Sequence, residues 1–171
     1  METLKFNDEN NILISIKNKF PSAEIENASI SKKRIYFSLK PDIFFQTIEF
    51  TALELGFFHL CTITGIDNLD SFEFLYHTAN ENGILLTLKL KTPRNDSVII
   101  KSVLPVYNGA TFYERELEGL FGIKVEGLPE GRQYPLPDNW PAGQYPLRKD
   151  WDPSKNEDKS QKENILREDV Q

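Results

Sequence analysis

The sequence predicts an α+β fold of two layers, in which a mixed, mostly antiparallel sheet is covered by helices and followed by a long extended tail. Two segments with helical spacing enclose a strand within the first 56 residues. A run of strand-like segments joined by short turns then occupies residues 57–103. Beyond residue 123 the chain becomes rich in proline and aromatic residues, and proline interrupts both helices and central strands.

The first part of the chain is predicted to hold a helix, a strand and a second helix. Asn7 or Asp8 can cap the first helix, whose apolar side chains follow helical spacing as far as residue 20. Residues 34–39 alternate apolar and polar side chains, as a half-buried strand does. Pro41 stands in the first turn of the second helix, and Gly56 is its natural stop.

The middle of the chain is predicted to form most of the sheet. Residues 57–64 are largely apolar, which favours a central strand. Two further strands, at 72–78 and 84–91, flank a glycine-containing loop suited to a hairpin. Another strand at 98–103 and a helix around 110–121 complete a globular domain that we expect to span residues 1–123.

Composition excludes several classes of function. The 171 residues include 20 Lys and Arg against 26 Asp and Glu, so a net charge of −6 argues against nucleic acid or anionic lipid as a main partner. One cysteine, Cys61, cannot form a disulfide within the chain, and two histidines are too few for a zinc or iron–sulfur site. Neither an apolar signal core nor a run of 18 apolar residues occurs, which predicts a cytosolic chain.

Residues 124–153 are predicted to form an extended tail. This stretch contains six of the ten prolines and both tryptophans, Trp140 and Trp151. Because proline lacks a backbone donor, the tail orders only along a surface, where each buried aromatic contributes roughly 1.5–3 kcal/mol. That surface is the chain's own domain or a partner, and we favour a partner that buries both tryptophans. The polar residues 154–171 are expected to be a flexible terminus or a weakly docking short helix.

Candidate catalytic and metal-binding residues are few. Glu114 and Glu118 share a helix face and could support acid–base chemistry, but a solvated or ion-pairing face is favoured because no nucleophile or positioned histidine accompanies them. His59 and Cys61 lie on one side of a predicted strand, and two ligands do not make a metal site. No catalytic, cofactor-binding or metal-binding residue is therefore predicted. A small-molecule enzyme using Glu114 and Glu116, and a binding module for an unrelated protein, stay open as alternatives.

Four motifs follow one another in the C-terminal half: residues 113–123 (YERELEGLFGI), 127–132 (GLPEGR), 136–140 (LPDNW) and 146–150 (PLRKD). Their ordered combination resembles the 30 kDa-subunit family of respiratory complex I, which includes small subunits of membrane-bound nickel–iron hydrogenases and of formate hydrogenlyases. The resemblance covers roughly residues 57–152.

Two positions depart from the usual pattern of that family. Gly119 stands where the family usually has Asp, and Leu128 where the complex I branch usually has His. With the Gln144-Tyr145-Pro146 form of the tail, Leu128 makes the chain resemble the branch of energy-converting hydrogenases of the Ech or carbon-monoxide-induced type.

The resemblance implies an accessory, non-catalytic subunit without a cofactor of its own. Such a subunit docks on the large catalytic subunit, a relative of the complex I 49 kDa subunit, on the cytoplasmic side of the membrane arm. The nickel–iron centre and the iron–sulfur clusters are then expected in partner subunits, and the chain is peripheral on the inner face of the cell membrane. The alternative is the equivalent subunit of a respiratory complex I (NADH or ferredoxin:quinone oxidoreductase) or of a formate hydrogenlyase.

The expected interface residues come from the last helix and the tail. Arg115 and Arg148 are expected to make charged contacts, within the subunit or across the interface, because a guanidinium can bind a carboxylate with two hydrogen bonds. The full set of expected interface residues is Glu114, Arg115, Glu116, Arg132, Trp140, Leu147, Arg148, Lys149, Asp150 and Trp151.

Overall fold

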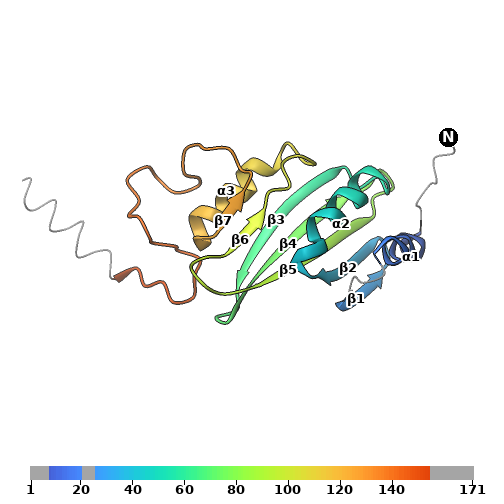
Figure 1. Ribbon diagram of the computed structural model, residues 1–171, viewed down its shortest axis with the longest axis horizontal. Helices are drawn as coiled ribbons and strands as arrows, with labels where there is room; N and C mark the ends of the chain where they lie inside the picture. The colour runs from blue at the N-terminus through green and yellow to red at the C-terminus, as the bar shows by residue number, and fades with distance from the viewer. Residues whose placement is uncertain (1–7, 21–25, 155–171) are drawn as a thin grey trace, which may run out of the picture.

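The computed structural model of the chain describes residues 8–20 and 26–154. The elements follow one another as α1 (Glu9–Lys19), β1 (Glu26–Ser31), β2 (Arg34–Leu39), α2 (Pro41–Leu53), β3 (His59–Asp67), β4 (Ser71–Ala79), β5 (Leu85–Pro93), β6 (Ile99–Lys101), α3 (Ala110–Phe121) and β7 (Lys124–Glu126). Residues 127–154 form the tail, which leaves the domain beside α3 (Figure 1). The terminus predicted for residues 154–171 lies, after Ser154, outside the described residues.

The main sheet has five strands in the order β1-β2-β5-β4-β3. Only β2 and β5 run parallel; the other neighbouring pairs are antiparallel. A second, small sheet pairs β6 with β7 in parallel. The prediction of a mixed, mostly antiparallel sheet is therefore confirmed.

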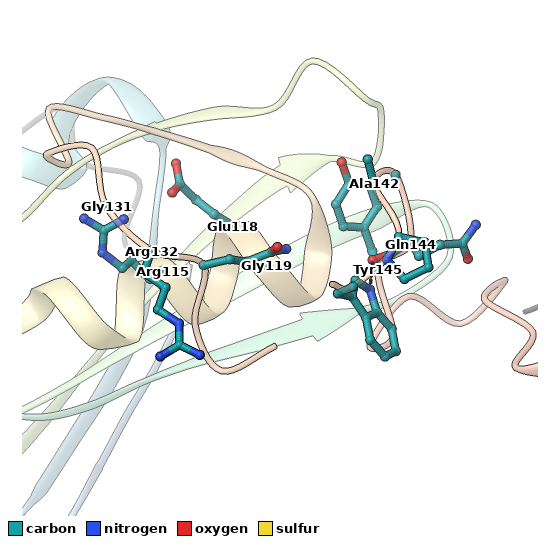
Figure 2. Close-up of a pocket in the computed structure, with 12 residues that line it drawn as sticks. Arg115, Glu118, Gly119, Gly131, Arg132, Ala142, Gln144 and Tyr145 are labelled. Atoms are coloured by element: carbon teal, nitrogen blue, oxygen red, sulfur yellow. Dashed lines mark hydrogen bonds between the residues drawn. The ribbon is translucent and has the colours of Figure 1, made fainter. Parts of the chain in front are cut away.

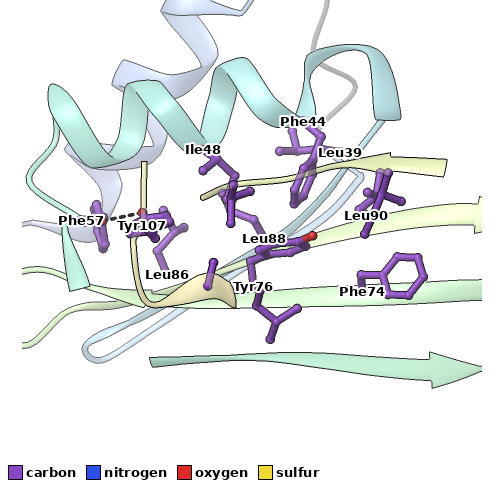
Figure 3. Close-up of a cluster of buried hydrophobic side chains, with 14 of the residues drawn as sticks. Leu39, Phe44, Ile48, Phe57, Phe74, Tyr76, Leu86, Leu88, Leu90 and Tyr107 are labelled. Atoms are coloured by element: carbon purple, nitrogen blue, oxygen red, sulfur yellow. Dashed lines mark hydrogen bonds between the residues drawn. The ribbon is translucent and has the colours of Figure 1, made fainter. Parts of the chain in front are cut away.

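The helices cover one face of this sheet. Phe72, Phe74 and Tyr76 alternate along β4, so their side chains point to the same side. Phe44 of α2 packs on Tyr76, with ring centroids 4.8 Å apart, and Figure 3 shows α2 lying over the strands. Phe121 of α3 packs on Phe72 at 6.0 Å. Because both helices bury the same row of aromatic residues, the fold is a two-layer α+β arrangement, as predicted.

Local signals place the element boundaries where the sequence predicted them. The Asp8 side chain accepts a hydrogen bond from the N–H of Asn10 at 3.1 Å and caps α1. Pro41 opens α2. Gly83 turns the β4–β5 hairpin with φ +70°, and Gly122 ends α3 with φ +67°.

Residues 57–64 do not form a central strand, so that prediction is wrong. β3 lies at the edge of the sheet, with β4 as its neighbour on one side. The helix α3 packs on β3. Gly65 permits this contact, because a Cβ there would lie 2.5 Å from the ring of Phe121. The Tyr113 hydroxyl of α3 also donates to the Cys61 carbonyl, at 3.0 Å. The helix therefore supplies both the packing and one edge hydrogen bond.

Two strands escaped prediction for opposite reasons. Every residue of β1 is exposed, so the strand carries no apolar alternation to detect. β7 has three residues and is recognisable only through its pairing with β6. Because β7 pairs with β6, strand pairing continues to Glu126, beyond residue 123, where we expected the domain to end.

Candidate functional site

The outer face of α3 is shaped to receive the tail. Arg115, Gly119 and Gly122 lie four and three residues apart, which places them on one side of the helix. A Cβ at Gly119 would lie 3.1 Å from the carbonyl oxygen of Tyr134, and one at Gly122 would lie 2.3 Å from the ring of Tyr145. The tail therefore lies directly against α3, at positions where the helix has no side chain.

Glu114 faces into the domain. Its carboxylate is fully buried and accepts hydrogen bonds from the Ser102 hydroxyl at 2.6 Å and from the Val103 N–H at 2.7 Å. Glu118, one turn later, accepts from the Val125 N–H at 3.0 Å. Burial raises the pKa of Glu114 above its ordinary value, and the two hydrogen bonds offset this only in part.

The expectations of a solvated acidic face and of an interface role for Glu114 are therefore corrected. Backbone donors next to β6 and β7 need acceptors when they are buried, and the two glutamates supply them.

Arg115 holds the first part of the tail from the outer face. Its Nη2 donates to the carbonyl of Pro129, and the guanidinium packs on Gly131, where a Cβ would lie 2.5 Å from it. This contact is to a neutral carbonyl, and Arg115 forms no ion pair among the described residues. Glu116 is half-buried, and within residues 8–20 and 26–154 no hydrogen bond or ion pair engages its carboxylate.

Arg148 closes the C-terminus of α3. Its Nε donates to the carbonyl of Phe121 at 2.6 Å and its Nη2 to that of Gly122 at 3.4 Å. Its Nη1 forms an ion pair with Asp96 at 2.8 Å, while the ring of Tyr145 lies under the guanidinium at 4.6 Å. A cation at this position satisfies the last carbonyls and complements the helix dipole. The expected charged contact of Arg148 is confirmed, and it lies within the chain.

Asp67 is a second anchor of the tail, formed by residues far apart in sequence. Its buried carboxylate accepts from the N–H of Leu69 at 2.8 Å, from the N–H of Lys149 at 2.9 Å and from Nε of Arg94 at 3.0 Å. Arg94 also pairs with Asp150. Burial alone would raise the pKa of Asp67, but these donors outweigh it and hold the pKa below its ordinary value.

The two tryptophans pack against each other in the outer tail. Their ring centroids lie 6.2 Å apart. Both indoles donate to Gln144: Nε1 of Trp140 to its backbone carbonyl at 2.8 Å, and Nε1 of Trp151 to the side-chain oxygen of Gln144 at 3.0 Å. Both tryptophans are half-buried, so the prediction that they are buried is wrong for this chain alone. Each indole covers part of the other and leaves ring surface exposed.

The tail is therefore fastened to its own domain at several points, and a partner on its outer side stays a prediction. Arg115, Asp67 and Arg148 fasten it, and the N–H of Leu147 adds a hydrogen bond to the carbonyl of Leu120 at 3.1 Å. The opposite side stays open, because the Leu147 side chain is 51% exposed and that of Tyr134 is 43% exposed.

A cavity of about 390 Å³ lies between α3 and residues 131–145 of the tail. Figure 2 shows Arg115 and Arg132 at one end, Gln144 and Tyr145 at the other, and Gly119 of α3 between them. The cavity combines two cations with aromatic and amide groups, a composition that suits protein recognition.

The described part of the chain offers neither a metal site nor a membrane span. No group of three or more His, Cys, Asp or Glu side chains there is placed to hold a metal ion. His59 is exposed and Cys61 is half-buried at the edge of the sheet. None of the described helices is long and apolar enough to cross a membrane.

Sequence reasoning missed Asp67, Arg94 and Asp96. Each lies in or beside a loop with no periodic pattern, and its partner in the tail is distant; Asp67 and Lys149 are 82 positions apart. The charged residues of the PLRKD motif were the only available signal, and they do not identify their partners.

Comparison with known proteins places this architecture among respiratory subunits. The profile of the family described as "Respiratory-chain NADH dehydrogenase, 30 Kd subunit" matches residues 37–157. A subunit of the F(420)H(2) dehydrogenase of Methanosarcina mazei is 38% identical, over 85% of this chain and 92% of that protein. Membrane-bound hydrogenase subunit beta of Pyrococcus furiosus is 26% identical, over 79% of this chain and 81% of that protein.

A larger relative and a solved structure extend this comparison. Formate hydrogenlyase subunit 5 of Escherichia coli is 29% identical over 81% of this chain, which spans only 25% of that protein. A chain in the structure of the membrane-bound sulfane sulfur reductase, described as an archaeal respiratory membrane complex, superposes with a TM-score of 0.77 at 28% identity. This match covers 90% of the present chain and 91% of that chain.

Proposed function

Because the chain belongs to the 30 Kd subunit family of the respiratory-chain NADH dehydrogenase, we propose that it is a non-catalytic accessory subunit of a membrane-bound nickel–iron hydrogenase complex. In this proposal it docks on the large catalytic subunit through α3 and the tail. The docking holds the large subunit and its iron–sulfur neighbours in the geometry that electron transfer needs. The nickel–iron centre and the clusters belong to those partners, and the chain sits on the cytoplasmic side of the membrane.

One observation carries the docking role. The tail is fastened to its domain from beneath by Asp67, Arg115 and Arg148, while its outer side presents aromatic and charged groups. Phe112 and Tyr134 form an edge-to-face pair at 5.4 Å, and both rings are largely exposed. Tryptophan, tyrosine and arginine dominate the energetic centres of protein interfaces. A surface held rigid before binding also loses little conformational entropy when a partner covers it.

A second candidate is the equivalent subunit of a complex I-like dehydrogenase. The relative from Methanosarcina mazei, which belongs to an F(420)H(2) dehydrogenase, is 38% identical, against 26% for the hydrogenase subunit from Pyrococcus furiosus. Leu128 and the Gln144-Tyr145-Pro146 form of the tail favour the hydrogenase. Nickel analysis of the purified complex distinguishes the two, because only a hydrogenase large subunit binds nickel and iron.

The docking role is tested by a charge placed on the exposed side of the tail. Leu147→Glu alters a side chain that is 51% exposed, and Ile14→Glu on α1 is the matched control at 53% exposure and the other end of the molecule (Figure 1). We expect Leu147→Glu to reduce recovery of the large subunit with the tagged chain at least tenfold and Ile14→Glu to leave it unchanged. Equal recovery with both variants would contradict docking through the tail.

A further inference from the structure

Two guanidinium groups line the cavity between α3 and the tail. The net charge of the chain is −6, yet Arg115 and Arg132 both line this cavity. Glu118 is the one carboxylate among its lining residues, and Oε1 of Glu118 is occupied by the N–H of Val125. Asp138, which is not among the lining residues, pairs with Arg132, so Arg115 is the cation of this cavity that has no ion pair among the described residues.

Arg115 lines this cavity with a guanidinium that is held in place. Pro129 and Gly131 hold the guanidinium through Nη2 and through close packing. Among the described residues, Nε and Nη1 of Arg115 have no acceptor. A guanidinium held in this way can bind a carboxylate through two parallel hydrogen bonds, because its planar donors match the two carboxylate oxygens.

Arg132 is held only weakly. Its partner is Asp138, at 2.7 Å, and the two side chains are 74% and 72% exposed. Ion pairs as exposed as this contribute little stability because water and salt screen them. An incoming carboxylate can therefore displace Asp138 from Arg132 at small cost.

We infer that this cavity receives an aspartate or glutamate side chain of the partner subunit. The inference rests on the proposed function and adds the chemistry of the contact. A volume of about 390 Å³ exceeds what a small free anion needs, since one water occupies roughly 30 Å³, and it accommodates a carboxylate with its aliphatic stem. Trp140 and Tyr145, which also line the cavity, provide apolar surface for neighbouring partner residues.

Zero-length cross-linking of the intact complex tests this contact. The double variant Arg132→Lys, Asp138→Asn places an amine at the cavity and removes the nearby carboxylate of the chain itself. After carbodiimide treatment we expect an amide bond between position 132 and an aspartate or glutamate of a partner subunit, identified by mass spectrometry. Arg34→Lys, on the exposed part of β2, is the matched control and is expected to form no such bond.

An intact complex in which position 132 couples to no partner carboxylate would overturn the inference. Coupling only to carboxylates of the same chain would overturn it as well. Retention of inorganic phosphate at this position, without a partner adduct, would assign the cavity to a free anion instead.

Charge reversal separates this inference from the docking proposal. Arg132→Glu is expected to weaken retention of the partner subunit at least tenfold in moderate salt, and Arg34→Glu less than twofold. If the unmodified chain retains no partner, the docking proposal itself fails. If it does retain a partner and Arg132→Glu behaves like Arg34→Glu, docking stands and the carboxylate contact is wrong.

Discussion

Three charged side chains around α3 bond to backbone groups, and one of them, Arg148, also pairs with an opposite charge. Glu114 and Glu118 accept from the N–H groups of Val103 and Val125, and Arg148 donates to the carbonyl of Phe121. A charge that satisfies buried backbone groups stabilises the fold, and its removal leaves those groups without partners.

Two substitutions of Glu114 separate hydrogen bonding from charge. Glu114→Ala leaves the Ser102 hydroxyl and the Val103 N–H unsatisfied in the core, and should lower the free energy of unfolding by roughly 2–4 kcal/mol. Glu114→Gln keeps an acceptor and a donor there and removes the buried charge, so it should cost less than about 1 kcal/mol at neutral pH. Urea denaturation followed by circular dichroism measures both.

The pH dependence of these variants has a definite sign. The folded chain has a raised pKa at Glu114, so ionisation disfavours the fold as pH rises from about 4.5 through the folded pKa. The stability of the unmodified chain should fall relative to that of Glu114→Gln over this interval. A constant difference would contradict the burial of an ionisable carboxyl.

Arg148→Ala should release the tail without unfolding the domain. It removes hydrogen bonds from a guanidinium to the last carbonyls of α3, worth roughly 1.5–3 kcal/mol in local stability. Hydrogen exchange should accelerate in residues 144–151 and stay unchanged in β4 and β5. Arg132→Ala, in an exposed ion pair, is the control and should leave exchange in residues 144–151 unaltered. Unchanged protection in Arg148→Ala would show that this anchor is unimportant.

At the scale of elements, α3 joins the sheet to the tail. Its inner side packs on β3 because Gly65 has no side chain, and its outer side meets the tail at Gly119 and Gly122. Glycine at these contacts sets how closely the neighbouring element can approach, so the tail follows a path that the helix determines.

Gly122→Ala should cost more than Gly83→Ala. Both glycines have positive φ, +67° and +70°, so each alanine carries a backbone penalty of about 1–2 kcal/mol. Only at Gly122 would the new Cβ collide with the ring of Tyr145, whereas Gly83 has nothing within 4 Å. Chemical denaturation of the two variants measures the difference. Equal losses of stability would mean that Tyr145 does not pack on α3.

Acid should detach the tail at its Asp67 anchor. The pKa of Asp67 is lowered in the folded chain. The stability that ionised Asp67 adds is therefore present at pH values above its ordinary pKa of about 3.8, and is lost as the pH falls through the folded pKa. Both tryptophans of the chain lie in the tail, so indole fluorescence reports its release while circular dichroism follows the domain. In Asp67→Asn we expect this fluorescence transition to disappear. A transition with the same midpoint in that variant would assign it to another carboxyl.

At the scale of the whole molecule, the two ends have different roles. The helices α1 and α2 lie toward one end of the molecule, and α3 and the tail lie toward the opposite end (Figure 1). The buried residues of the main core, among them Phe44, Tyr76 and Leu88 (Figure 3), include none from the tail, although Leu128 packs against them. Folding and docking are thus assigned to different parts of one chain.

Truncation after Glu126 should leave a folded domain that no longer docks. Because no buried core residue belongs to the tail, we expect cooperative thermal unfolding with Tm lower by roughly 5–15 °C, from the loss of the Arg148, Asp67 and Leu128 contacts. Scanning calorimetry measures this change, and co-purification measures the loss of the partner. Loss of cooperative unfolding would show that the tail is part of the folding unit.

The sequence by itself determined the features that depend on neighbours in the chain. Helical spacing, the cap at Asp8 and the glycine-containing hairpin loop are local signals, so they predicted the helices, the hairpin and the α+β class. The ordered motifs of residues 113–150 likewise identified the family, which the profile match over residues 37–157 confirms.

Only the tertiary structure decided which groups each charged residue contacts. Helical spacing puts Glu114 and Glu118 on one side of α3 but does not say that this side meets the backbone at β6 and β7. Nor does any local pattern join Asp67 to Lys149 across 82 positions. Such contacts exist only once the sheet has brought distant segments together, because burial and hydrogen bonding depend on what packs nearby and not on what precedes along the chain.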